Sequence, residues 1–204
     1  MLQYTSVSES TLGLLKSLML PPFPDDFYLV GGTSLALQIG HRESIDLDLF
    51  TSADLDTDLL IRYAEELGQV EVVKRTKAIM TIILNDVKVD FVNLQYPLID
   101  ELLIEDGIRF ATPKDIAAMK VAAITGRGAK KDFIDLYFLL KQFSLEEIID
   151  FYQQKYNDHT LFLTYKSLNY FVDADTQEMP VMFQPVEWET IKTTINSEVR
   201  RILP

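Results

Sequence analysis

Two glycines at the start of a short predicted helix constrain this chain more than any other feature. Gly31 and Gly32 follow an apolar segment typical of a buried strand, and residues 33–39 predict a short helix closed by Gly40. A Gly-rich turn that opens a helix presents backbone N–H groups that have no partner inside the helix. The sequence therefore predicts a strand–turn–helix unit whose helix start suits a negatively charged ligand.

The segment after this helix carries two aspartates that alternate with apolar residues. Asp46 and Asp48 are separated by Leu47, and Ile45 and Leu49 flank them. Successive side chains of a strand point to opposite faces, so the two carboxylates share one face. Like charges at this spacing repel each other, and an apolar strand gains nothing structural from both. A divalent cation would remove the repulsion, and it supplies a reason for the pair.

A third carboxylate fits the same interpretation. Residues 79–92 predict a β-hairpin that turns at Asn85-Asp86, and Asp90 faces away from its apolar neighbours. If this hairpin lies beside the segment with the first two aspartates, three carboxylates converge. Oxygen ligands of this kind suit Mg²⁺ or Mn²⁺ and not Zn²⁺. Together with the Gly-rich helix start, they indicate metal-dependent chemistry on phosphates.

At this point the chain resembles a known family. Residues 31–50, GGTSLALQIGHRESIDLDLF, resemble the AbiEii/AbiGii toxin family of nucleotidyltransferases in the DNA polymerase β superfamily. Residues 112–120 match that family's helix with an internal lysine, and residues 130–136 match its late Lys-Asp…Asp-Leu motif. The resemblance covers roughly residues 25–145 in the same order, and residues 166–188 match more loosely.

The resemblance implies transfer of a nucleotide from an NTP to an acceptor hydroxyl, with RNA, such as the tRNA 3′ end, as the acceptor. It also implies the toxin of a toxin–antitoxin or phage-defence (abortive infection) pair, with a cognate antitoxin as partner. The expected catalytic residues are Asp46, Asp48, Asp90, Lys120, Asp132 and Asp135, of which the first three would hold Mg²⁺ or Mn²⁺. The expected nucleotide-binding residues are Gly31, Gly32, Thr33, Ser34, Arg42, Lys120 and Lys131.

Structural explanations stay open for several of these residues. Thr33 and Ser34 could simply cap the helix. Arg42 suits a phosphate because its guanidinium offers a fork of donors, but with His41 it could instead form a solvated loop pair. Asp132 could simply sit in the first turn of its helix, where it complements the helix dipole.

Lys120 is harder to explain as an ordinary surface residue. It lies one helical turn after Ile116 and one turn before Ile124, on the apolar side of its helix. A carboxylate or phosphate opposite the ammonium would explain this position, and snorkelling along the side-chain stem is the alternative. Lys130 and Lys131 either hold substrate phosphates or are solvated. The spacing does not decide whether Asp132 or Asp135 acts in the site.

Composition excludes several classes of protein. The chain has no cysteine, which excludes disulfides, and only two histidines, which argues against a zinc site. We expect His159 to be a surface or capping residue. The net charge of −12 argues against nucleic-acid binding by the whole surface, although basic residues cluster at 74–77 and 114–131. Without a leader or a long apolar run, we expect a cytoplasmic protein with no membrane partner.

The mixture of elements predicts an α/β (α+β) fold: a small mixed sheet flanked by helices, as in nucleotidyltransferases, with a mostly helical C-terminal half. Residues 1–110 would form the catalytic core, and residues 111–204 a helical part that completes the site. Helices are expected at residues 8–20, 33–39, 57–67, 112–126, 131–143, 144–156 and from about 187. Two rival functions remain: a transferase acting on a small molecule or protein side chain, and a non-catalytic partner-binding module.

Overall fold

The computed structural model describes residues 1–157 and 161–202, so His159 lies outside the described residues. The chain divides into two compact units. Unit 1 consists of Met1–Tyr96 and Glu101–Ala111, and unit 2 consists of Pro97–Asp100 and Thr112–Pro204.

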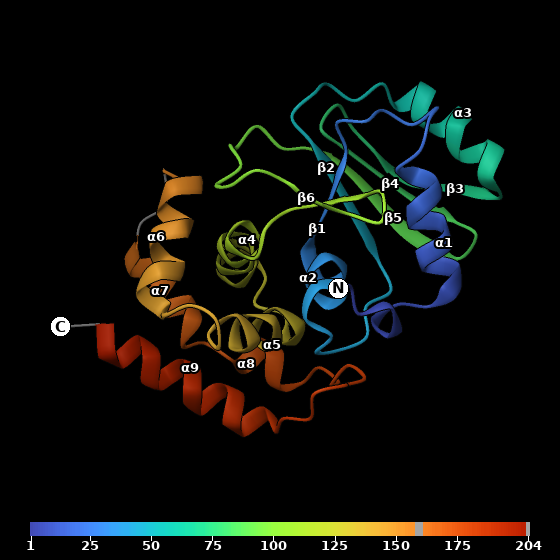
Figure 1. Ribbon diagram of the computed structural model, residues 1–204. Helices are drawn as coiled ribbons and strands as arrows, with labels where there is room; N and C mark the ends of the chain where they lie inside the picture. The colour runs from blue at the N-terminus through green and yellow to red at the C-terminus, as the bar shows by residue number, and fades with distance from the viewer. Residues whose placement is uncertain (158–160, 203–204) are drawn as a thin grey trace. The chain divides into compact units, whose positions relative to one another are not determined.

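Unit 1 is built on a seven-stranded mixed sheet with the strand order β3-β4-β5-β2-β1-β7-β6 (Figure 1). The strands are β1 (Tyr28–Val30), β2 (Leu47–Thr51), β3 (Val70–Arg75), β4 (Ile79–Leu84), β5 (Val87–Asn93), β6 (Leu103–Glu105) and β7 (Ile108–Phe110). The helices of this unit are η1 (Tyr4–Ser6), α1 (Glu9–Leu18), α2 (Gly31–Ile39) and α3 (Thr57–Leu67). The expected fold class, a mixed sheet with helices around it, is confirmed.

One face of the sheet forms the core of unit 1 together with α1 and α3. The alternation of β2 and β5 places Leu47, Leu49, Val89 and Phe91 on this face, all fully buried. Apolar residues of the two helices join them in one cluster: Leu14, Leu15, Leu18, Leu60 and Ala64. The aspartates of β2 and β5 therefore point to the opposite face of the sheet.

The expected hairpin is confirmed, and it lies beside β2. β4 and β5 pair antiparallel, and the turn residues Asn85 and Asp86 adopt positive φ angles of 49° and 66°. Both residue types tolerate the left-handed region, which matches the right-handed twist of the strands. β5 then pairs with β2 in parallel.

A second hairpin was not expected from the sequence. No strand is predicted between residues 93 and 111, yet β6 and β7 pair antiparallel there, and β7 adds to β1 in parallel. Asp106 and Gly107 form the turn with φ angles of 51° and 75°. An Asp-Gly pair is a hairpin signal, but the strands beside it are three residues each, too short for a convincing alternation.

Unit 2 is helical among its described residues (Figure 1). Its helices are α4 (Pro113–Gly126), α5 (Lys130–Leu139), α6 (Leu145–Lys155), α7 (Leu161–Leu168), α8 (Val172–Asp175) and α9 (Trp188–Ile202). α4 packs against α5, α6 and α7, while α5 packs against α8 and α9. Thr112 and Ser144 accept hydrogen bonds as the expected N-caps of α4 and α6.

α5 is shorter than expected. The sequence predicts a helix from Lys131 to Phe143, but α5 ends at Leu139, because the backbone then tightens into turns. The amides of Lys141 and Gln142 bond three residues back rather than four. Within the described part of the chain, no helix is both long and apolar enough to cross a lipid bilayer.

Candidate functional site

α2 begins at Gly31, two residues earlier than the sequence predicts, and the two glycines leave room for the side chains of Asp48 and Arg42. Gly31 has a φ of +71°, and a Cβ at this position would overlap Asp48 Oδ2. A Cβ on Gly32 would likewise overlap Arg42 Nη2. The N-cap residue Val30 offers no side-chain cap, so no side-chain oxygen of the N-cap satisfies the first N–H groups of the helix. The turn thus brings uncapped backbone donors close to the Asp48 carboxylate.

The hydroxyl groups of Thr33 and Ser34 are turned into the protein. Thr33 Oγ1 donates to the carbonyl oxygen of Asp46 and lies 2.8 Å from Ser44 Oγ. Ser34 Oγ accepts a hydrogen bond from Gln38 Nε2 at 3.0 Å, and Thr33 and Ser34 are both buried. Neither hydroxyl caps α2, so the capping explanation is wrong. Thr33 instead ties the helix start to the backbone that leads into β2, which leaves backbone N–H groups as the phosphate donors to consider.

His41 and Arg42 are buried, so the solvated-loop explanation is also wrong. His41 is fully buried, and Arg42 is 3 % exposed. The Arg42 guanidinium lies against Gly32 and donates from Nη1 to the Glu43 carbonyl at 2.9 Å. This position supports the Gly-rich turn, and a contact between Arg42 and a phosphate stays a prediction.

Asp48 and Asp90 face each other across neighbouring strands. The parallel register of β2 and β5 pairs Asp48 with Asp90, and Leu47 with Val89. Neighbouring strands lie about 4.8 Å apart, so the two half-buried carboxylates are close enough to repel. Asp46 lies two residues before Asp48, just before β2 begins, and its neighbour Ile45 is exposed rather than on the buried face that the sequence predicts. The register therefore places Asp48 and Asp90 side by side, with Asp46 at the start of the same strand.

The side chains do not form a ready cluster of ligands. Among the described residues, no three His, Cys, Asp or Glu side chains are arranged to hold a metal ion. Protein groups engage Asp90 instead: Lys88 Nζ donates to Oδ2, and the Thr81 hydroxyl donates to Oδ1.

The charges around Lys88 show that this face of the sheet attracts cations. Partial burial alone would lower the pKa of Lys88, but its hydrogen bond to Asp90 and the Asp90 charge outweigh that effect. The charges of Asp46 and Asp48 add to the rise in the Lys88 pKa. The oxygen-only donor set and the repulsion between the carboxylates fit a divalent ion of the Mg²⁺ type.

Lys120 lies in unit 2 and is buried opposite carboxylates, as its helical position predicts. The residue is 4 % exposed, and its Nζ lies 3.0 Å from Asp132 Oδ1 and 2.6 Å from Asp135 Oδ2. Arg127 adds a fork to Asp132, with Nε–Oδ2 at 2.9 Å and Nη2–Oδ1 at 3.1 Å. Snorkelling is therefore not the explanation for Lys120.

The cations of this cluster set the protonation of Asp132. Complete burial of the carboxyl group would raise its pKa, but the charges and hydrogen bonds of Lys120 and Arg127 outweigh burial and hold the pKa of Asp132 below its usual range. Asp132 and Asp135 both contact Lys120. The spacing in the sequence did not decide between these two aspartates, and the structure shows that both belong to the cluster.

The two lysines at the start of α5 differ in their surroundings. Lys130 is buried, neither solvated nor open to a phosphate: its backbone N–H donates to Gln177 Oε1 at 2.9 Å, and its Nζ donates to the Gln177 carbonyl. The same ammonium lies 5.1 Å from the centre of the Trp188 ring. Lys131 is exposed, and its expected role in nucleotide binding stays a prediction.

Unit 2 contains a buried ion pair that the sequence does not predict. Lys155 Nζ lies 2.8 Å from Asp115 Oδ1 and donates to the Pro97 carbonyl at 2.7 Å. Asp115 also accepts the Ile99 backbone N–H at 3.1 Å, so the pair fastens the segment 97–100 to α4 and α6. Asp115 Oδ2 also lies 3.2 Å from the hydroxyl of Thr112, the N-cap of α4, and nothing in the sequence marks Lys155 as the ion-pair partner of Asp115.

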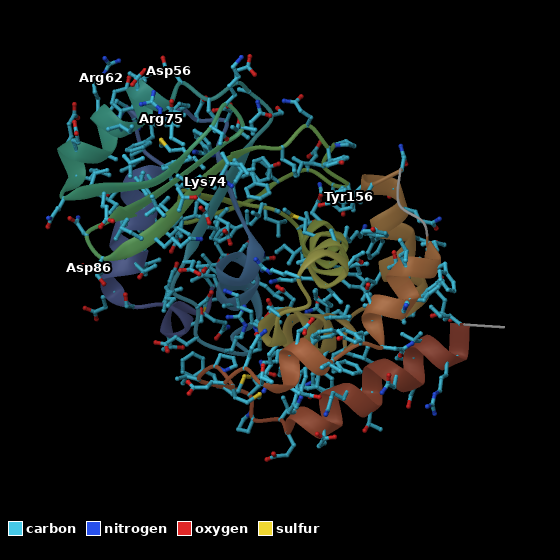
Figure 2. The ribbon with its side chains drawn as sticks, turned by 180° about the vertical axis from the view of Figure 1, so that it is seen from behind. Asp56, Arg62, Lys74, Arg75, Asp86 and Tyr156 are labelled. Atoms are coloured by element: carbon cyan, nitrogen blue, oxygen red, sulfur yellow. The ribbon has the colours of Figure 1, made fainter. Side chains whose placement is uncertain are left out.

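The basic residues of β3 do not form a patch of one sign. Arg75 pairs with Asp58 at 2.8 Å and donates to the Thr57 hydroxyl at 2.8 Å, both at the start of α3. Figure 2 shows this end of α3, where Arg75 and Arg62 lie near Asp56. Acidic residues thus offset part of the basic cluster predicted at residues 74–77.

Comparison with known proteins identifies the family of this chain. Residues 13–201 match the family described as "Nucleotidyl transferase AbiEii toxin, Type IV TA system". Protein aq_aa25 of Aquifex aeolicus (strain VF5) is 35% identical over 187 residues, which cover 88% of this chain and 89% of that protein.

Two solved structures are similar in fold. JHP933 from Helicobacter pylori superposes with a TM-score of 0.59 at 21% identity, covering 97% of this chain and 93% of that one. MenT4, a nucleotidyltransferase toxin from Mycobacterium tuberculosis, superposes with a TM-score of 0.56 at 15% identity, covering 95% of this chain and 83% of that one.

Proposed function

Because the chain belongs to the AbiEii nucleotidyl transferase toxin family, we propose that it transfers a nucleotide from an NTP to an acceptor hydroxyl, with Mg²⁺ or Mn²⁺ at Asp46, Asp48 and Asp90. The observation that carries this proposal is the register that sets Asp48 opposite Asp90, with the Gly31 turn against Asp48. A structural role alone does not explain two carboxylates placed against each other on one sheet face.

Each group at this site has a task in the proposed reaction. Bound divalent cations would neutralise the triphosphate and make the attacking hydroxyl more acidic. The acceptor oxygen forms a bond to the α-phosphorus, the bond to the β-phosphate oxygen breaks, and pyrophosphate leaves. Asp90 would accept the proton of the attacking hydroxyl. The N–H groups at the start of α2, at Gly32 and Thr33, would bind phosphate oxygens.

The Lys120 cluster is the second part of the proposal. Its ammonium is held by Asp132 and Asp135 within unit 2, and we assign it a role in binding the triphosphate on the strength of the family motif alone. The test is Lys120→Met, for which NTP-dependent stabilisation is measured at a temperature where both variant and wild type are folded and should be smaller than that of wild type. Lys114→Met on the same helix is the control, because Lys114 is exposed and pairs with an exposed carboxylate, Asp100.

RNA is the acceptor that we favour, with the tRNA 3′ end as the specific candidate. The protein partner that we propose for this chain is a cognate antitoxin. The family description supports the antitoxin, and the RNA acceptor rests on the sequence resemblance alone. The purified chain should therefore transfer label from one of the four α-labelled NTPs to total RNA in the presence of Mg²⁺. Label on total protein or on a small molecule instead would favour the rival substrates. No transfer, with no stabilisation by any Mg²⁺–NTP, would favour the partner-binding module.

A further inference from the structure

Lys88 holds the position where a cation is needed at the candidate metal site. It lies on β5 two residues before Asp90, so both side chains are on the same face of the sheet. Its Nζ is bonded to Asp90 Oδ2, while the Thr81 hydroxyl from β4 is bonded to Oδ1. Both oxygens of the third expected metal ligand therefore have protein partners in this structure.

The ammonium offsets a repulsion that the fold itself creates. The β2–β5 register fixes Asp48 opposite Asp90, and the backbone offers no means of separating them. Like charges directly opposite on adjacent strands destabilise a sheet. The Lys88 ammonium is bonded to Asp90, and the negative charges of Asp46 and Asp48 also stabilise it. In the metal-free protein, Lys88 therefore reduces the repulsion between the carboxylates, as a bound divalent ion would do in the metal-bound protein.

Lys88 and a divalent ion compete for the same oxygen. Mg²⁺ requires its oxygen ligands at about 2.0–2.1 Å in near-octahedral geometry, which leaves no room for an ammonium hydrogen-bonded along the same lone pair. The Lys88 side chain is 42 % exposed, so it has room to leave, whereas Asp90 at 17 % exposed does not.

We propose that Lys88 is a built-in competing cation, which holds Asp90 in the metal-free protein and leaves it when a divalent ion binds. This inference rests on the proposed metal site. Lys88 acts here through Asp90 and is a positioning residue. It keeps the acidic face stable without metal and lowers the affinity of that face for metal.

Lys88→Met tests this directly, because methionine keeps most of the side-chain stem and removes the charge. Mn²⁺ binding is measured by titration calorimetry, and thermal unfolding is measured in EDTA and in Mn²⁺. We expect the variant to bind Mn²⁺ about fivefold more tightly, to melt at a lower temperature in EDTA, and to gain more from Mn²⁺ than the wild type does. Lys88→Gln gives the same comparison with a polar end if the methionine variant folds poorly.

Two controls make the result specific. Lys77→Met removes an exposed charge from the turn between β3 and β4 and should leave the Mn²⁺ affinity unchanged. Lys88→Arg keeps the charge and should restore wild-type affinity. If the wild type binds Mn²⁺ and the charge-removing variants bind it equally well, the competing-cation role is refuted and the metal site stands. If neither wild type nor variant binds Mn²⁺, both the inference and the proposed metal site fail.

Discussion

Replacing Lys120 by methionine should strongly destabilise unit 2, which tests whether its ion cluster is a buried structural feature. The ammonium contacts two carboxylates, at 3.0 Å to Asp132 and 2.6 Å to Asp135, and both of these residues are fully buried. On sequence alone this variant is expected to fold well, because methionine preserves the stem. The structure changes that expectation, since the charge is compensated inside the protein.

The magnitude follows from what remains after the substitution. Arg127 still donates to Asp132 after the substitution, whereas Asp135 loses the Lys120 ammonium that lies 2.6 Å from its Oδ2. Removing one partner of a buried ion pair costs about 3–5 kcal/mol. A domain has a total stability of about 5–15 kcal/mol, so a large share would disappear.

Urea denaturation at pH 7 measures the change in the free energy of unfolding, with an unchanged m-value as the check on compactness. Lys114→Met should cost at most about 1 kcal/mol, because its ion pair with Asp100 is exposed. The double variant Lys120→Met/Asp135→Leu should recover part of the loss, since removing both partners avoids a buried charge without its cation.

The effect should also depend on pH with a definite sign. The pKa of Asp132 is lowered in the folded protein, so its ion pairs contribute above the unfolded-state pKa and are lost as the pH falls through the folded-state value. The part of the difference between wild type and Lys120→Met that comes from the Lys120–Asp132 contact should therefore be complete above about pH 5 and shrink below about pH 4. A loss under about 1 kcal/mol at pH 7, equal to that of Lys114→Met, would refute the buried cluster.

Two further predictions concern unit 1 and the nucleotide. An NTP with Mg²⁺ at about 100 times its dissociation constant should stabilise the protein by about 2.7 kcal/mol in a thermal-shift titration, and EDTA should remove most of the gain; no shift with any of the four NTPs, with Mg²⁺ or Mn²⁺, would contradict it. Gly31→Ala and Gly107→Ala both place alanine at positive φ and should each cost about 1–2 kcal/mol. Only Gly31→Ala should also weaken Mn²⁺ binding measured by calorimetry, because its Cβ would displace Asp48; equal binding by both variants would contradict this assignment.

The parts of this fold that local chemistry determines could be predicted from the sequence. The Asn85-Asp86 turn, the Gly40 cap with its positive φ, and the N-cap at Ser144 each depend on a few adjacent residues. The alternation of β2 and β5 likewise fixes which side chains share a face. These signals placed Asp48 and Asp90 on the polar faces of their strands, whereas the pairing of β5 with β2 was only a condition of that argument and depends on the tertiary fold.

The parts that were missed depend on residues far apart in the chain or on partners that alternation does not reveal. Asp115 lies in α4 and Lys155 in α6, with the whole of α5 between them in the sequence, and only the packing of α4 against α6 brings them together. Lys88 carried a usable signal, since it stands two residues before Asp90 on the polar face of β5. His41 and Arg42 looked like a loop pair because burial of a charged side chain depends on what packs over it.

One matched pair of variants tests whether Asp48 is a metal ligand in a nucleotide-transfer site. Asp48→Asn removes a charge opposite Asp90, whereas Asp86→Asn removes a charge at the hairpin turn (Figure 2), where asparagine tolerates the φ of 66°. Label transfer from NTP to RNA is measured for both, with Mn²⁺ binding and metal-free melting alongside.

We expect Asp48→Asn to fold, to melt no lower than wild type in EDTA because a repulsion is relieved, and to lose Mn²⁺ binding and more than about 100-fold of the transfer rate. Asp86→Asn should keep both the Mn²⁺ binding and the transfer rate of the wild type. An Asp48→Asn protein that transfers nucleotide at close to the wild-type rate would contradict the account.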